Sequence, residues 1–358
     1  VPNESYREHH GLTWLLNHMG YLKNDDSAYQ AGVDYFGFKP DEQNESYELN
    51  EIPEDFGETD FIYLADTYGV YQEDLAWNEQ SQEAENAPSL VYGGLEMAEW
   101  QSIQNQVDAG DSDLVVEFNT LASPTSTEVR DTAADYLGIQ PTGWSGRKFN
   151  ELDEQQEEVP KWVVSRFEET GNSWNFAGAG FVLANDQSGE ILVLSEQEGL
   201  IGADGIQLDF TEAGQELFSM EDSPEFTYWF DINEAAESSI LANYKWDLSE
   251  KGKALLAENG IPSSFPAIVH QQKNTAETFY FAGDFVDIAE VPSFYQFAGF
   301  AKVRSWLSFE SISGDTSFFW KTYAPMMKKI LENTASPETV AAAPELASDE
   351  GIAYPARV

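Results

Sequence analysis

The 358-residue sequence contains no cysteine. This absence excludes a disulfide, a thiol nucleophile and a metal site built from thiolates. Histidine is almost as rare, with only His9, His10, His18 and His270 in the chain. No two of them have the spacing of a zinc motif on a helix. The sequence also has no apolar run of about 18 residues, so it predicts no membrane-spanning segment.

Basic residues are scarce as well. There are 18 Lys and Arg against 64 Asp and Glu, a formal net charge of −46. Like charges at this density oppose compaction, and molar salt screens them because it shortens the Debye length to about 3 Å. The composition therefore predicts a salt-adapted protein, with an ordinary acidic extracellular protein as the alternative. Too few Lys and Arg are present for binding nucleic acid or an anionic membrane surface.

Apolar residues are plentiful enough for a folded core. Hydrophobic residues make up 42% of the chain and aromatic residues 14%, so the acidity does not indicate disorder. The length exceeds the usual limit of about 250–300 residues for one simple core, which predicts one large domain with insertions or two domains. Because the sequence starts at Val1 rather than Met, we expect a removed leader or a trimmed chain, and a location outside the cell or in its envelope, in high salt.

The first half alternates strand and helix patterns. Short apolar runs at 12–17, 60–66 and 113–118 predict buried strands. Helical patterns occupy 95–107 and 127–137, and Ser126 and Gly138 are suited to begin and end the second helix. Alternation of this kind predicts a mostly parallel sheet with helices on both faces.

The second half begins with a predicted β-hairpin at 180–194 and a strand at 226–231. A helix at 248–258, strands at 265–269 and 278–283, and a final helix at 320–331 follow. We therefore expect one α/β domain over 1–331, with an inserted β-hairpin region around 172–235. Residues 332–358 form an Ala-, Pro- and Glu-rich C-terminal tail. If the tail is ordered, it must rest on its own domain or on a neighbouring chain.

Polar side chains follow three of the predicted strands. They are Asp66 and Tyr68 at the end of strand 60–66, Glu117 and Asn119 at the end of strand 113–118, and Asp284 and Asp287 after strand 278–283. In open α/β sheets, ligands bind beyond the carboxyl ends of the strands. If the strands are neighbours, these side chains converge on one cleft.

Two carboxylates of this group could work as an acid and base pair. Glu117 and Asp284 would do so if one were held protonated and the other ionised. The alternative is that they cap helices or bind backbone amides. Asp284 and Asp287 could also bind a hard cation such as Ca²⁺ through oxygen, or simply stabilise a turn. The sequence predicts no other cofactor.

Arginine is informative because the chain has only six. Arg130 and Arg147 are candidate ligand-binding residues, and Arg147 ends a glycine-flanked turn, 143–147, that also contains Trp144. Such an arginine suits a clamp on a carboxylate or a sugar hydroxyl, and an internal salt bridge is the alternative. Tyr68 and Trp144 could stack on sugar rings, although most aromatic residues of the chain must belong to the core.

Seven segments, taken as a set, resemble a poorly characterised bacterial family related to the class I glutamine amidotransferase-like fold. They are 12–17, 34–37, 62–71, 92–96, 117–120, 143–147 and 281–284, and the resemblance spans about 11–331. It implies a flavodoxin-like, mostly parallel sheet. Amidotransferases of this class use a cysteine at a strand-to-helix turn, which corresponds here to 117–120. Because the chain has no cysteine, glutamine hydrolysis by that mechanism is excluded.

The sequence thus predicts a protein whose strand-end cleft binds a polar small molecule, a carbohydrate above all. Hydrolysis of that ligand is left open, with Glu117 or Asp284 as acid or base. The alternative is a non-catalytic structural or interaction protein of an extracellular assembly, in which the tail docks on a neighbour and the chain self-associates. A deep cleft at the strand ends would favour the first function. A tail crossing an interface would favour the second.

Overall fold

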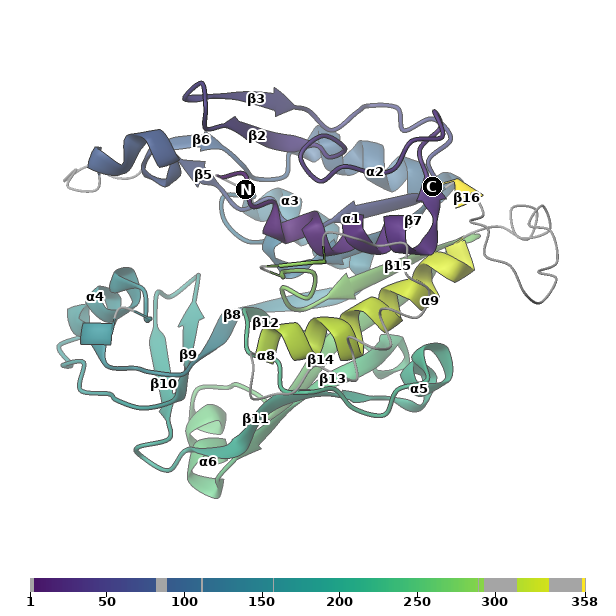
Figure 1. Cartoon of the computed structure of the whole chain (residues 1–358). Coiled ribbons are helices and arrows are strands. Elements are labelled where there is room, and N and C mark those ends of the chain that lie inside the picture. The colour runs from purple at the N-terminus through teal and green to yellow at the C-terminus, as the bar shows by residue number, and fades with distance from the viewer. Residues whose placement is uncertain are drawn as a thin grey trace.

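A computed structural model describes residues 3–81, 89–110, 112–156, 158–288, 290–292, 314–334 and 356–357. The fold is mixed α/β and is built on a six-stranded sheet (Figure 1). In spatial order its strands are β11 (Ile201–Phe210), β13 (Ile240–Leu248), β14 (Ser264–Lys273), β15 (Ala276–Phe281), β7 (Asp113–Glu117) and β4 (Phe61–Leu64).

The strand directions correct the expectation of a mostly parallel sheet. Only β15, β7 and β4 run parallel to one another, whereas β11, β13 and β14 pair antiparallel along the other half. The reason is visible between β14 and β15, which are separated by Asn274 and Thr275 alone. So short a connection makes a hairpin, since a parallel pair needs a crossover of a dozen or more residues.

A second, wholly antiparallel sheet lies beside the first. Its order is β10 (Ile191–Ser195), β9 (Gly180–Asn185), β8 (Ile139–Phe149) and β12 (Phe230–Ala235). The predicted hairpin at 180–194 is confirmed as β9 and β10. A bridge between Phe230 and Gly283 links this sheet to the end of β15. The second sheet is thereby held against the carboxyl edge of the parallel strands.

Helices cover both faces of the six-stranded sheet. In Figure 1, α1 (Arg7–Met19) and α9 (Ala324–Thr334) cross the near side, and α2 (Met97–Ala109) and α3 (Thr127–Leu137) lie behind. The run 12–17, predicted as a strand, is part of α1. Its buried residues Leu12, Leu15 and Leu16 have the i, i+3, i+4 spacing of one helix face.

The remaining elements are short. They are β1 (Tyr21–Leu22), β2 (Gly37–Asp41), β3 (Ser46–Asn50), β5 (Val70–Tyr71), β6 (Leu90–Tyr92), β16 (Ala356–Arg357), α4 (Lys161–Glu169), α5 (Glu212–Phe218), α6 (Glu250–Glu258), α8 (Gly314–Phe318), the π-turn η6 (Phe319–Tyr323), and the 3₁₀ turns η1 (Gln72–Asp74), η2 (Ala76–Ser81), η3 (Phe118–Thr120), η4 (Glu154–Gln156) and η5 (Glu237–Ser239). No helix among the described residues is long and apolar enough to cross a membrane.

The predicted tail is described only at its two ends. Residues 335–355 and 358 lie outside the described part of the chain. Residues 332–334 still belong to α9, and β16 pairs in parallel with β1. The predicted final helix, 320–331, is confirmed as η6 followed by α9.

Candidate functional site

The ends of three parallel strands bring the predicted polar residues together. β7 lies between β15 and β4, with Phe281 opposite Glu117 and Leu64 opposite Val116. Asp66, Glu117 and Asp284 therefore leave the sheet at the same edge. This is the arrangement that we expected from their positions after the strands.

Glu117 is fully buried at this edge, with 0% of its surface exposed. Its Oε1 accepts hydrogen bonds from the Tyr63 hydroxyl at 2.7 Å and from the Val286 N–H at 3.0 Å. Burial raises the pKa of Glu117 well above its ordinary value, and the two donors oppose that rise only in part. The folded protein therefore favours the protonated form of this side chain.

Asp284 is buried next to Glu117. The Asn119 Nδ2 lies 3.4 Å from Asp284 Oδ2, and Oδ1 has no hydrogen-bond partner. Burial raises the pKa of Asp284 well above its ordinary value, and the charges of Glu117, Asp287, Asp66 and Glu8 raise it further. We call these five acids (Glu8, Asp66, Glu117, Asp284 and Asp287) the carboxylate cluster.

Asp287 forms an ion pair with Arg7. Arg7 Nε donates a hydrogen bond to Asp287 Oδ1 at 2.5 Å. Across the described ranges, no group of three or more acids or histidines is arranged to hold a metal ion. The predicted Ca²⁺ site at Asp284 and Asp287 therefore gains no support from the geometry of these residues.

Arg147 is held by aromatic rings. Its guanidinium lies over Tyr228 at 4.8 Å, Phe149 at 5.1 Å and Trp229 at 5.9 Å, measured from Cζ to the ring centroid. The Arg7 guanidinium also lies over the Tyr228 ring, with its Cζ 5.5 Å from the ring centroid. No salt bridge of Arg147 occurs within the described part of the chain. Cation–π contacts therefore hold the guanidinium in place of the internal salt bridge that was the alternative role of Arg147.

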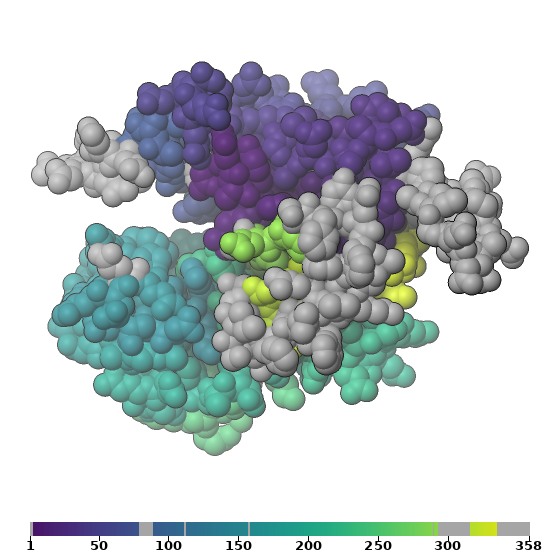
Figure 2. All heavy atoms as spheres, viewed as in Figure 1, coloured from purple at the N-terminus to yellow at the C-terminus, as the bar shows by residue number. Residues whose placement is uncertain are grey.

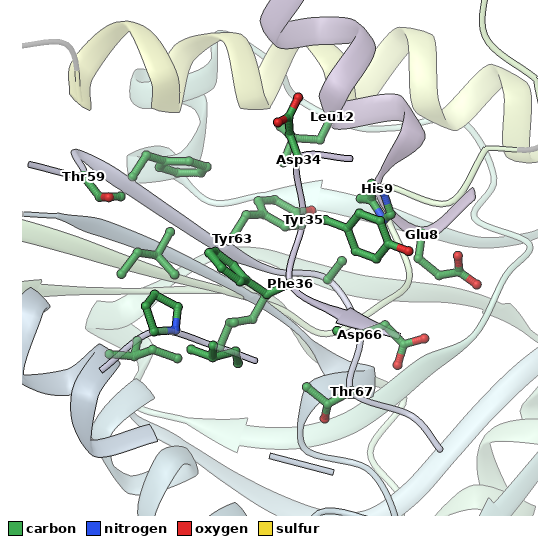
Figure 3. Close-up of a pocket in the computed structure, with 18 of the residues that line it drawn as sticks. Glu8, His9, Leu12, Asp34, Tyr35, Phe36, Thr59, Tyr63, Asp66 and Thr67 are labelled. Atoms are coloured by element: carbon green, nitrogen blue, oxygen red, sulfur yellow. The ribbon is translucent and has the colours of Figure 1, made fainter. Parts of the chain in front are cut away.

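A cavity of about 610 Å³, the first cavity, borders the cluster (Figure 3). It lies between α1, β4 and the segments leading into and out of the β2–β3 hairpin. Its lining includes nine aromatic residues: Tyr29, Tyr35, Phe36, Phe38, Phe56, Phe61, Tyr63, Tyr68 and Tyr92. Five acids also line it: Glu8, Asp34, Asp55, Glu58 and Asp66. No lysine or arginine is among the described residues that line it.

Two members of the carboxylate cluster face this first cavity. Figure 3 shows Glu8 and Asp66 on the same side of it, near Tyr35 and His9. Burial is the main cause that raises the pKa of both carboxyl groups, and the charge of Asp287 adds to both rises. His9 Nε2 donates a hydrogen bond to Ala31 O, 2.8 Å away, and burial lowers the pKa of His9 to about 4. His9 is thus neutral at pH 7.

A second cavity of about 300 Å³ is lined by residues of η3, α3, α4 and the four-stranded sheet. Its lining contains the predicted ligand-binding residues Tyr68, Arg130 and Trp144. Arg130 pairs with Asp186 at 3.0 Å and with Asp131 at 3.3 Å. Tyr68, 54% exposed, lines both cavities.

The predicted site residues therefore do not line one cleft. They are divided between two cavities and a group that lines neither. Asp66 and Tyr68 line the first cavity, and Tyr68, Arg130 and Trp144 line the second. Glu117, Asn119, Asp284 and Arg147 are not among the residues that line either cavity, and of these four only Glu117 and Asp284 are buried. Other lining residues were not predicted. Phe36 carries no local signal, whereas the rarity of arginine could have singled out Arg166.

No protein-family model, curated protein or solved structure matches the chain. The resemblance to the class I glutamine amidotransferase-like fold therefore stays a prediction from the seven sequence segments. What the protein does must be argued from the chemistry of its own cavities.

Proposed function

We propose that the chain binds a polyhydroxylated ligand, a carbohydrate, in the first cavity. The observation that carries this proposal is the lining itself: aromatic rings and carboxylates, with no lysine or arginine. Carboxylates accept hydrogen bonds from hydroxyl groups, and aromatic rings offer flat apolar faces to the C–H faces of sugars. The volume of about 610 Å³ is in the usual range for small-molecule sites, about 300–1,000 Å³.

The charge of the lining narrows the ligand class. Five acids face the cavity, and only Asp34 has a basic partner there, Lys23 at 2.9 Å. The Oε2 of Glu8 is buried without a hydrogen-bond partner among the described residues, so a ligand hydroxyl could donate the missing hydrogen bond. An anionic ligand would be repelled by the same groups. The first cavity therefore favours neutral sugars over phosphorylated, sulfated or carboxylated ones.

Hydrolysis needs a carboxyl group in reach of the glycosidic oxygen. Glu117 and Asp284, the predicted acid and base, line neither cavity. We therefore propose binding and assign these two residues no hydrolytic step. Their raised pKa values are explained by burial at the strand ends.

The wider setting of this function is also a proposal. The net charge of −46 supports a salt-adapted protein working outside the cell or in its envelope. The three parallel strands with polar residues at their carboxyl ends support a distant flavodoxin-like, amidotransferase-like origin. The alternative of an assembly protein requires the tail to leave its own domain, whereas β16 pairs with β1 of the same chain. Ligand binding is therefore the function that we favour.

Phe36 offers the test. It lines the first cavity and is 53% exposed, so its removal should not empty a core. We expect the full chain to bind neutral oligosaccharides on a glycan array. The Phe36→Ala variant should then weaken that binding by about 0.5–1.5 kcal/mol in calorimetry. Val33→Ala is the matched control, since Val33 is equally exposed, at 53%, and lines neither cavity. Equal affinity in the two variants would refute sugar binding in this cavity.

A further inference from the structure

The second cavity has a charge pattern unlike that of the first. Two of the six arginines in the chain, Arg130 and Arg166, line it. Only two acids, Asp186 and Asp231, line it with them. In a chain of net charge −46, this is a local enrichment in positive charge. It indicates a ligand that carries negative charge.

Both guanidinium groups keep free donors. Arg130 uses Nε and Nη1 for its two acidic partners, and its Nη2 makes no hydrogen bond to the described residues. Arg166 has only a distant contact, 3.8 Å to Glu169, and both side chains are more than half exposed. Gly189, at a φ of +72°, lets the Arg166 guanidinium lie against the β9–β10 turn, because a Cβ there would come within 3.0 Å of Cζ.

The wall of the cavity also holds an unsatisfied amide. Asn233 is 1% exposed, and within the described ranges neither its Nδ2 nor its Oδ1 makes a hydrogen bond of normal geometry, although Asp231 and Tyr280 are adjacent. Asp231 accepts from the Tyr280 hydroxyl at 2.7 Å through Oδ2, while its Oδ1 is buried without a partner. Buried polar atoms of this kind are normally paired. A ligand with hydroxyl groups would satisfy them.

Aromatic rings complete the lining. Trp144 is buried in it, and Trp162 and Tyr68, each 54% exposed, stand at its rim. Figure 2 shows the hollow on the left of the molecule, between the blue residues of the N-terminal third and the teal residues around α4. The volume of about 300 Å³ is suited to a single ring.

We propose that the second cavity binds a carboxylate carried on a hydroxylated ring, the chemistry of a uronic acid. Arg130 and Arg166 bind the carboxylate, Asn233 and Asp231 bind ring hydroxyls, and the rim rings pack on the sugar face. Guanidinium groups are suited to carboxylates because their planar donors match the two oxygens. This site shares only Tyr68 with the neutral-sugar site among the described lining residues, and the proposal does not depend on sugar binding there.

The test is calorimetric titration of the full chain with D-galacturonate, tri-galacturonate and D-galactose. D-Galactose has the same ring without the carboxylate. We expect D-galacturonate or tri-galacturonate to bind at least tenfold more tightly than D-galactose at this site. Binding of the trimer alone identifies the end of an acidic polysaccharide, and binding of the monomer identifies a free sugar acid. If neither acid binds, or if D-galactose binds equally well, the proposal is overturned.

Two variants locate the binding. Arg166→Gln should weaken uronate binding at least tenfold, whereas Lys253→Gln should leave it unchanged. Lys253→Gln is a matched control because it also removes one positive charge and one i,i+3 helix pair, with Glu250 in α6. Asn233→Leu should weaken uronate binding while the ligand-free protein keeps its melting temperature. Loss of uronate binding in Phe36→Ala instead would place it in the first cavity and refute this assignment.

Discussion

The buried carboxyl groups should make stability depend on pH in an unusual direction. Burial raises the pKa of Glu117 above its ordinary value of 4.5, so the folded state holds this proton more tightly than the unfolded state does. The contribution of this proton to the free energy of unfolding is complete below pH 4.5 and is lost as the pH rises towards the folded-state pKa. Asp66, Asp284 and Glu8 shift in the same direction.

Glu117→Gln tests this directly. Glutamine keeps one acceptor for the Tyr63 hydroxyl and the Val286 N–H but cannot ionise. We expect the variant to gain stability over the native protein as the pH rises above 4.5, by up to about 1.4 kcal/mol per pH unit within the window. Urea unfolding from pH 4 to pH 8 measures the difference. Glu48→Gln, an exposed site on β3, should show no such trend. A pH-independent difference for Glu117→Gln would contradict the explanation.

Arg147 is expected to stabilise the fold rather than bind ligand. Its guanidinium lies over Tyr228, Phe149 and Trp229, and a lysine ammonium cannot stack in this way. Arg147→Lys should therefore lose about 0.5–2 kcal/mol of stability, measured by urea unfolding. Its affinity for neutral sugars and for D-galacturonate should not change. If Arg147→Lys kept its stability but lost affinity for either ligand, Arg147 would be a ligand-binding residue, as the sequence suggested.

At the scale of elements, local signals predicted α3 well. Ser126 and Gly138 flank it as expected, the serine as N-cap and the glycine in the left-handed conformation at a φ of +75°. The run 12–17 was misassigned because a short apolar stretch fits a buried strand and a helix equally well. The N-cap of α1 is Tyr6, whose backbone is in the left-handed conformation and whose side chain makes no capping hydrogen bond. No sequence signal therefore marks the start of α1.

The N-cap of α3 provides a prediction at this scale. Ser126 Oγ accepts from the Val129 N–H at 3.4 Å, and α3 carries Arg130 to the second cavity. Ser126→Ala should cost about 0.5–2 kcal/mol of unfolding free energy. Ser102→Ala, inside α2, is the control and should cost nothing, because alanine is the better helix former. Equal costs in the two variants would show that the cap contributes no stability.

For the whole molecule, the sequence predicted the shared edge but not the cavities. The edge follows from general topology, since strands 60–66, 113–118 and 278–283 end in polar residues and pair in parallel. The cavities depend on how distant loops pack. The first cavity needs the segments around Phe36 and Phe56, and the second needs the four-stranded sheet and α4 to lie near η3 and α3. No local pattern encodes such placements.

The net charge gives the last prediction. With 64 acids and 18 bases, the chain carries an excess of 46 negative charges, and their mutual repulsion opposes folding. Melting temperature should rise steeply from 0.05 M to about 1 M KCl and then flatten, because the Debye length has by then fallen to about 3 Å. Sucrose, which stabilises by exclusion from the surface rather than by screening, should give a gradual rise without that plateau. A flat or falling curve in KCl would contradict salt adaptation, and a KCl curve with the shape of the sucrose curve would assign the stabilisation to exclusion instead.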